Sequence, residues 1–353
     1  MMETEALMQD ELKTLLNRLL ITHSPCGQEG EMEDLCRELL TPRCDEVRTD
    51  PNDNVIGKIA GESSEGGLLL MAHKDEISTI VRRMDEDGKV WVDPLGGCVP
   101  WVYGEGPFDL LGDEVITGVL SVGSRHSSHL SPTIAQAKTL ALTWEMCYLD
   151  CKLSRTELEA RGVHLGSRAC VARSRKTPFY IGECVGGYAL DDKAAVAVLM
   201  LTADLIRASG RQPKTDLYLA MTGSEEMGCG GGAYVAQTVP AVTQLAVEIA
   251  PVAPEYPTRM VADPVGFYKD AVFLLHKGLA DELCAAAHVA CGGYQRLIVR
   301  SFGSDASAAA KIGLAGRAGC VGFATENTHG FELGHLGGMV NCARMLAEFA
   351  LGR

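Results

Sequence analysis

The sequence predicts an α/β protein with a mostly parallel central sheet, helices on both faces of that sheet, and a small all-β, barrel-like domain inserted into the chain. Apolar runs with the length of buried strands alternate with stretches of helical periodicity, as in β-α-β units. Between residues 79 and 177 the pattern changes to short runs rich in β-branched and aromatic residues. We therefore expect one discontinuous domain, formed by residues 1–78 and 178–353, and a second domain formed by residues 79–177.

Length and composition fit this division. A chain of 353 residues exceeds the size at which a single core usually stops growing. A hydrophobic fraction of 46% and a mean hydropathy of +0.06 are typical of a globular protein with a large core. The net charge of −14 disfavours nucleic acids and anionic membranes as partners, because both are bound through clustered Lys and Arg.

The sequence contains no run of 18 apolar residues, and its first ten residues already include Glu3, Glu5 and Asp10. We therefore expect neither a spanning segment nor a leader, and a cytoplasmic protein. The 13 cysteines are odd in number and form no C-x-x-C pair, which indicates reduced, mostly buried thiols rather than a disulfide framework.

The N-terminal part opens with an amphipathic helix, in which leucines recur at helical spacing and which ends near His23. A second amphipathic helix is predicted over residues 29–40. Short strands are expected at 47–50 and 54–59, and a buried parallel strand at 68–72.

In the inserted domain, segments 80–84 and 89–93 flank an Asp-Glu-Asp-Gly turn, which predicts a hairpin. Further strands are expected at 115–122, 140–149 and 169–172. Beyond the insertion the predicted elements are helices at 194–206, 280–290, 306–312 and 340–351, and strands at 216–221, 245–250, 296–300 and 319–324.

Polar residues follow two of the predicted buried strands. His73 and Asp75 come after the first, and an H-x-D pair allows an imidazole to bind a metal while a carboxylate fixes its tautomer. Glu225 and Glu226 come after the strand at 216–221, and the carboxyl ends of parallel strands are where open α/β folds bind ligands. Taken singly, these residues are better explained as an ordinary loop histidine and a solvated turn.

Four further polar residues stand out, at three places in the sequence. Asp191 and Asp192 precede a helix, where an N-cap explains one aspartate but not two. Glu248 lies within an apolar run, where a carboxylate is costly to bury unless it is paired or binds a metal. His329 follows the last predicted strand.

Together these residues can form a metal centre. Two histidines and three carboxylates suffice for two metal ions that share one bridging carboxylate, and zinc accepts both nitrogen and oxygen ligands. One glutamate is then left over, and in a hydrolytic two-metal site the spare carboxylate is a general base that takes a proton from water. The candidates are His73, Asp191, Glu225, Glu226, Glu248 and His329.

These motifs resemble those of the tetrahedral-aminopeptidase family, the glutamyl and deblocking aminopeptidases with a dinuclear metal centre. The resemblance covers essentially the whole chain and rests on five short motifs in the right order. They are Ala72-His73-Lys74-Asp75-Glu76, Ala189-Leu190-Asp191-Asp192-Lys193, Ser224-Glu225-Glu226-Met227-Gly228, Glu248 and Thr328-His329-Gly330. The Gly303-Ser304-Asp305-Ala306 turn also fits the family's order.

The resemblance implies a zinc-peptidase type of fold and a role for each residue. Asp191 bridges two divalent metal ions, zinc first and cobalt as the alternative. His73 and Glu248 complete one site, and Glu226 and His329 complete the other. The catalytic pair is then Glu225 as general base, acting on a water that bridges the metals, and Asp75, which orients His73. The resemblance also implies a cis peptide bond between Asp191 and Asp192.

The family further implies that the inserted β domain forms dimers and controls access to the site, and that dimers associate into a hollow dodecamer. The chain departs from the family pattern at several points. Glu248 stands where Asp is usual, and the typical Arg-Tyr before and Ser-Pro after His329 are absent, so that His335 competes as a ligand. Lys74 replaces a commoner apolar residue, Ser78 a glycine, and Lys193 an arginine.

Three functions therefore compete. The leading hypothesis is a metal-dependent aminopeptidase that removes N-terminal residues from short peptides. The altered surroundings of His329 suggest an amidase or deacylase acting on a small acylated metabolite as the alternative. The third hypothesis is a non-catalytic relative that kept the scaffold. An endoglucanase function, a label that some relatives carry, is disfavoured because the site lacks the two-carboxylate geometry of metal-free glycosidases.

Overall fold

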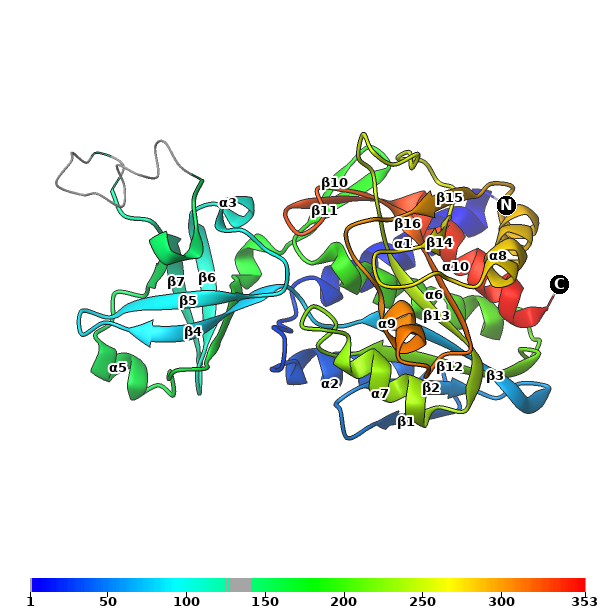
Figure 1. Ribbon diagram of the computed structural model, residues 1–353, viewed down its shortest axis with the longest axis horizontal. Helices are drawn as coiled ribbons and strands as arrows, with labels where there is room; N and C mark the ends of the chain where they lie inside the picture. The colour runs from blue at the N-terminus through cyan, green and yellow to red at the C-terminus, as the bar shows by residue number, and fades with distance from the viewer. Residues whose placement is uncertain (1, 125, 127–140, 353) are drawn as a thin grey trace.

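The computed structural model describes residues 2–124, 126 and 141–352. An α/β domain contains both ends of the described chain, and a β-barrel projects from it (Figure 1). Within the described residues, no helix has the length and apolar character needed to cross a bilayer.

The α/β domain is built on an 11-stranded sheet. Its central four strands are parallel: β12 (Thr215–Thr222), β3 (Ser63–His73), β13 (Ala241–Pro251) and β16 (Arg317–Glu326). All four were expected from their apolar runs. Because these strands are parallel, their carboxyl ends lie along one edge of the sheet.

On both flanks, the strands that join this parallel centre run antiparallel to it. On one side β12 pairs with β2 (Val55–Ile59), which pairs with β1 (Glu46–Thr49). On the other side β16 pairs with both β14 and β17, and these lead to the remaining edge strands. The strands of this second flank are β14 (Val265–Lys269), β15 (Gln295–Ile298), β17 (Glu332–His335), β11 (Cys184–Gly187) and β10 (Phe179–Ile181).

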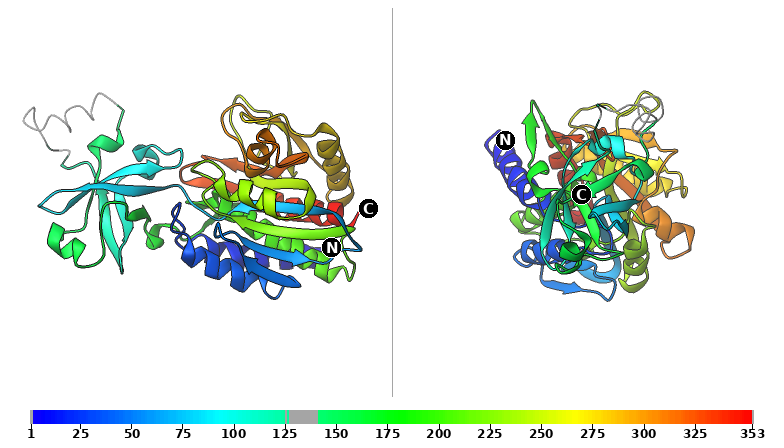
Figure 2. Two further views of the ribbon diagram at one scale, coloured as in Figure 1. Left: turned by 60° about the horizontal axis from the view of Figure 1, so that its bottom comes forward. Right: turned by 90° about the vertical axis from the view of Figure 1, so that its left-hand side faces the viewer.

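Both faces of the central strands are buried, as a parallel sheet requires. In β3, Leu68 and Leu70 belong to one apolar core, and Leu69 and Met71 belong to the other. The first core includes residues of α1 (Met2–Leu19), α2 (Gly30–Leu40), α6 (Leu190–Ala208), α8 (Lys277–Ala290) and α10 (Leu336–Leu351). The second includes residues of α7 (Gly230–Thr238) and α9 (Asp305–Lys311). Helices therefore cover both faces of the sheet, as predicted (Figure 2, left).

The inserted domain is a closed barrel with the strand order β4-β5-β8-β7-β6-β9. The predicted hairpin is confirmed, because β4 and β5 pair antiparallel. The strands are β4 (Ser78–Met84), β5 (Lys89–Leu95), β6 (Gly106–Leu111), β7 (Val115–Ser121), β8 (Tyr148–Asp150) and β9 (Arg168–Val171), and the short helices are α3 (Pro100–Tyr103) and α5 (Arg155–Glu159).

The strand expected over 140–149 is mostly absent. Residue 140 lies outside the described residues, and the segment forms a 3-10 helix, Trp144–Met146, before the short strand β8. The apolar residues of this segment serve to fill the barrel core. Trp144 is buried there, and its Nε1 donates to the carbonyl oxygen of Cys98 at 3.1 Å. The stretch therefore fills the barrel interior instead of extending a strand.

Five buried polar residues, called here the junction cluster, connect the barrel to the α/β domain. They are His23, Glu76, Asp109, Lys176 and Lys193. The Lys176 Nζ donates to Glu76 Oε1 at 2.8 Å and to His23 Nδ1 at 2.9 Å, and the Lys193 Nζ lies 3.3 Å from Glu76 Oε1. His23 Nε2 lies 3.0 Å from Oδ2 of Asp109, which comes from β6 of the barrel. Every carboxylate of the junction cluster thus has a basic partner within the cluster.

Candidate metal centre

The predicted site residues meet at the carboxyl-terminal edge of the parallel strands. His73 is the last residue of β3, Glu225 and Glu226 occupy the turn after β12, and Glu248 lies near the end of β13. Asp191 stands at the start of α6, and His329 lies in the turn between β16 and β17. Together they line a cavity of about 250 Å³.

Asp191 lies between the two histidines. Its Oδ1 is 3.1 Å from Nε2 of His73, and its Oδ2 is 3.4 Å from Nε2 of His329. Oε1 of Glu226 lies 3.7 Å from the same nitrogen of His329. Each oxygen of the Asp191 carboxylate thus faces a different imidazole, which is the arrangement expected of a carboxylate shared by two cations.

Backbone geometry places Asp191 in this position. The Asp191–Asp192 peptide bond is cis, as the resemblance implied, and both residues depart from helical φ/ψ although they open α6. The two aspartates therefore do not act as a simple N-cap pair.

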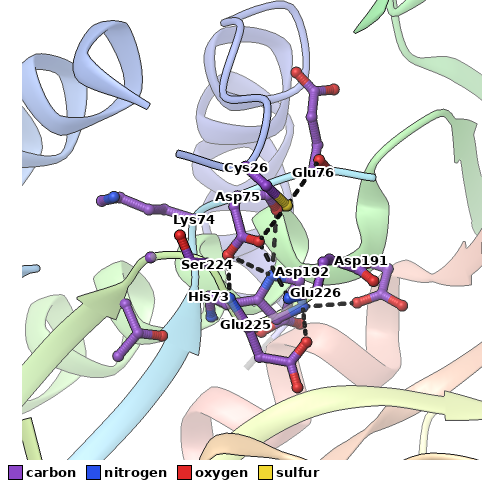
Figure 3. A network of polar contacts seen from close by, with 12 residues as sticks. Cys26, His73, Lys74, Asp75, Glu76, Asp191, Asp192, Ser224, Glu225 and Glu226 are labelled. Atoms are coloured by element: carbon purple, nitrogen blue, oxygen red, sulfur yellow. Dashed lines mark hydrogen bonds and ion pairs between the residues drawn. The ribbon is translucent and has the colours of Figure 1, made fainter. Parts of the chain in front are cut away.

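The neighbouring glutamates point in different directions (Figure 3). The carboxylate of Glu226 faces His329 and Asp191. Oε2 of Glu225 lies 3.9 Å from Nε2 of His73, and its Oε1 accepts a hydrogen bond from the Cys229 thiol at 3.1 Å. Glu226 therefore lies among the candidate ligands, while Glu225 lies beside them.

Asp75 contacts both His73 and the turn that presents the glutamates. Nδ1 of His73 lies 3.4 Å from Asp75 Oδ1 and 3.2 Å from the Asp75 carbonyl oxygen. The same carboxylate accepts the backbone N–H groups of Glu225 at 3.0 Å and Glu226 at 3.2 Å, and the Cys26 thiol at 3.1 Å. Its position therefore fits the orienting role implied for it and adds a second contact, to the turn.

Glu248 lies beside Asp192, which is not among the ligands expected from the sequence. Ligand atoms of His73, Asp192 and Glu248 all lie within 4.8 Å of one another. Asp192 Oδ2 accepts the backbone N–H of His73 at 3.2 Å, whereas its buried Oδ1 has no hydrogen-bond partner among the described residues. The doubled aspartate in the sequence was the available signal for Asp192.

Glu332 and the barrel support the other histidine. The Glu332 carboxylate accepts the backbone N–H groups of Asp191 at 3.0 Å and His329 at 3.1 Å. Nδ1 of His329 donates to the carbonyl oxygen of Gly97, between β5 and α3 of the barrel, at 2.8 Å. A Cβ on Gly97 would lie 3.2 Å from the His329 ring, so glycine permits this close approach. Nothing in the sequence pattern pointed to Glu332 or Gly97.

His335, the competing ligand, lies elsewhere. It precedes α10, where its Nδ1 accepts the N–H of Gly338 at 3.1 Å, and its Nε2 is 3.7 Å from Glu183. His335 therefore has a structural role at the helix start.

The charge balance of the site favours bound cations. Burial, together with nearby carboxylates and against the effect of the histidines, raises the pKa of Glu225 and of Glu226 to about 7. Burial, followed by Asp192, raises the pKa of Glu248 well above its usual range. Against the effect of burial, the carboxylates of Asp191 and Asp75 raise the pKa of His73 well above its usual range. The site therefore holds more carboxylates than imidazoles, and Oδ1 of Asp192 has no hydrogen-bond partner among the described residues. This set of oxygen and nitrogen donors fits a borderline divalent cation.

Another potential ligand group consists of two residues of the junction cluster, His23 and Glu76, and the neighbouring Cys170. The Lys176 ammonium group donates to both His23 and Glu76, so this group already has a cation of its own.

Comparisons with known proteins identify similar chains. A curated protein of Bacillus subtilis (strain 168), named "Putative aminopeptidase YhfE", is 24% identical over 336 residues, covering 94% of this chain and 95% of its own length. The structure of a TET aminopeptidase from the Thaumarchaeota archaeon SCGC AB-539-E09 has a TM-score of 0.89 at 21% identity, with 97% of this chain and 96% of that chain covered. A structure of the Pyrococcus horikoshii TET1 peptidase, which can assemble into a tetrahedron or a large octahedral shell, has a TM-score of 0.84 at 19% identity, with coverages of 98% and 100%.

These structural likenesses show the fold, and the sequence itself shows the family. Residues 53–345 match the model of one family over most of the chain. The chain belongs to the M42 glutamyl aminopeptidase family.

Proposed function

We propose that this chain is a metal-dependent aminopeptidase that hydrolyses N-terminal residues from short peptides with two divalent cations bound at the candidate centre. The observation that carries the proposal is the pair of imidazoles on the two oxygens of Asp191, with Glu225 left beside them. Family membership supports the same reaction class.

The ligands divide into two groups around Asp191. His73 and Glu248 would hold one cation, with Asp192 close to both, and Glu226 and His329 would hold the other. Zinc fits the mixed nitrogen and oxygen donors best, with cobalt as the alternative. When bound, the cations supply Lewis acid chemistry that polarises the scissile carbonyl and lowers the pKa of water.

Glu225 is the proposed general base. Its carboxylate borders the cavity beside His73 and is not one of the proposed ligands, so it is free to take a proton from the attacking water and give it to the leaving nitrogen. Asp75 keeps His73 in one orientation and fixes the turn that carries Glu225. The carboxylate-rich cavity also suits the ammonium group of a free N-terminus, since opposite charges attract strongly in a partly desolvated site.

Metal analysis combined with an activity assay tests this proposal. Protein purified without chelator should contain two divalent ions per chain and cleave members of a panel of short peptides and aminoacyl anilides. Chelation should abolish cleavage, and zinc or cobalt should restore it. A protein with two ions per chain that cleaves no member of the panel contradicts the proposal.

The same assay separates the alternatives. N-acyl amino acids and amides in the panel report an amidase or deacylase, the function suggested by the unusual residues around His329. A non-catalytic relative would hold little metal, and the substitution Glu225→Gln would change no measurable function.

We propose in addition that the chain associates into dimers through the barrel, and that dimers assemble into a dodecamer around an enclosed space. The assembly of the P. horikoshii TET1 peptidase and the projecting position of the barrel support this. Light scattering coupled to size-exclusion chromatography should give a mass near twelve chains, and a monomer at micromolar concentration contradicts it.

A further inference from the structure

The turn that presents Glu225 is held by side chains rather than by sheet pairing. The four successive backbone N–H groups of residues 223–226 each have a buried side-chain acceptor. Gly223 donates to Asn54 Oδ1 and Ser224 to Glu29 Oε1, both at 3.0 Å. The next two amides donate to Asp75, as described above. Ser224 has a left-handed φ of +54°, so this turn needs outside support to keep its shape.

Glu29 is the most remote of these acceptors in sequence, and it has a buried cation of its own. Its Oε1 accepts the N–H groups of Gly27 at 3.1 Å and Ser224 at 3.0 Å. Its Oε2 forms an ion pair with the Nζ of Lys74, which also lies 3.9 Å from Glu33. Lys74 is fully buried, so its charge must be compensated by this partner.

The Glu29–Lys74 pair lies directly against the turn (Figure 3 shows Lys74 beside Ser224). A Cβ on Gly223 would lie 2.4 Å from Glu29 Oε2 and 3.0 Å from Lys74 Nζ. Only glycine leaves room for the pair at this position.

We propose that Glu29 and Lys74 are positioning residues for Glu225. This inference rests on the proposed function, in which Glu225 is the general base. Lys74 pairs with the buried Glu29 carboxylate, and this carboxylate fixes the Ser224 amide and with it the direction in which the next residue leaves the turn. Neither residue lines the cavity at the candidate ligands, so the pair acts only through the backbone of the turn.

The direct test is Lys74→Met, which keeps a long apolar side chain and removes the charge. We expect kcat to fall about 10- to 100-fold with KM and metal content little changed, because a displacement of about 1 Å at a catalytic group has this cost. Glu29→Gln should also lower kcat, since it removes the nearer of the two carboxylates beside the buried Lys74 charge.

The double variant Lys74→Met with Glu29→Gln should recover part of the lost kcat. A neutral glutamine needs no cation, and its amide oxygen still accepts the Ser224 N–H. The matched control is Lys176→Met, which removes an equally buried lysine from the junction cluster. It should lower thermal stability without the selective loss of kcat.

Hydrogen exchange supplies a readout that does not depend on peptidase activity. Backbone amides of residues 223–226 should exchange at least about tenfold faster in Lys74→Met and keep their wild-type rate in Lys176→Met. Unchanged exchange of this turn, a loss of metal parallel to the loss of kcat, or strictly additive effects in the double variant would overturn the inference. If the wild-type chain with two ions cleaves no peptide, the proposed function fails, while the exchange data still decide whether the pair holds the turn.

Discussion

The residues of the candidate metal centre, called here the metal-centre cluster, and the junction cluster are both buried and polar. Carboxylates predominate in the first, whereas each carboxylate of the second has a basic partner. In the junction cluster, Lys176 and Lys193 lower the pKa of Glu76 to about 2 although burial acts in the other direction. In the metal-centre cluster, burial and neighbouring carboxylates raise the pKa of Glu225 and Glu226 to about 7. No lysine is among the described residues that line that cavity.

The difference shows in which cluster the chain's own side chains compensate the charge of the buried carboxylates. A buried carboxylate needs a partner, and the junction cluster supplies ammonium groups from two segments of the chain. The metal-centre cluster offers two imidazoles to a larger number of carboxylates among the described residues, and under the proposed function bound cations would supply the positive charge that it lacks. Changes that remove charge should therefore affect catalysis in one cluster and folding stability in the other.

The largest effect is expected from removing the cations. A strong chelator should reduce peptidase activity to background while the junction cluster keeps the two domains folded, as followed by circular dichroism. Because cations that bind only the folded state stabilise it, the melting temperature should also fall. Activity that survives when elemental analysis finds no metal would contradict the role of the centre.

The second prediction concerns the general base. Glu225→Gln should lower kcat about 10²- to 10⁴-fold, the usual contribution of acid–base catalysis, with two cations still bound. Glu183→Gln, at an exposed carboxylate, is the control and should leave kcat unchanged. If Glu225→Gln instead loses its cations, Glu225 is a ligand and the roles of the two glutamates have to be exchanged.

The third prediction is a loss of stability from the junction cluster. Glu76→Gln leaves two buried ammonium groups without their carboxylate and should lower the free energy of unfolding by about 3–5 kcal/mol. Chemical denaturation measures this, and Glu62→Gln, in an exposed pair with Lys214, should cost under about 1 kcal/mol. Equal effects of both substitutions would show that the junction charges are not coupled as described.

The fourth prediction follows from the pKa of Glu76. A folded-state pKa of about 2, below the ordinary 4.5, means that this carboxylate stabilises the folded protein above pH 4.5. The stabilisation, about 3 kcal/mol from the size of the shift, is lost as pH falls from 4.5 towards 2. The difference in unfolding free energy between wild type and Glu76→Gln should therefore shrink over this range. A difference that stays constant with pH contradicts this assignment.

The smallest effect is expected at Asp192. Asp192→Asn should weaken binding of one cation about 10- to 100-fold, as loss of a residue that supports a ligand usually does. Competition with a chromogenic chelator measures this, and Asp204→Asn, farther along α6, serves as the control. Unchanged affinity would mean that the free oxygen of Asp192 contributes nothing to the centre.

Much of the α/β domain could be predicted because its central strands are continuous apolar runs, buried on both faces. The short strands β10, β11 and β17 could not, since three or four residues give no clear periodicity and β11 and β17 also contain glycine. In the barrel, the aromatic and apolar residues near Trp144 suggested a strand, but burial of the indole side chain decided their conformation.

The candidate site was predictable where a residue violates its local pattern. Glu248 interrupts an apolar strand, and His73 and the paired glutamates follow strand ends. The supporting residues obey their local patterns and gave no such signal. Glu29 is 195 residues from Ser224 in sequence, and the hydrogen bond between them exists only because of the tertiary fold.

The hydrogen bond from His329 to the Gly97 carbonyl has a consequence for how separable the two domains are. A chain joined directly across residues 79–177 would keep every proposed ligand but lose the acceptor that orients one of them. We therefore expect such a shortened chain to fold its sheet but to bind the cation proposed at His329 weakly. The insertion is in this sense part of the candidate site rather than an added module.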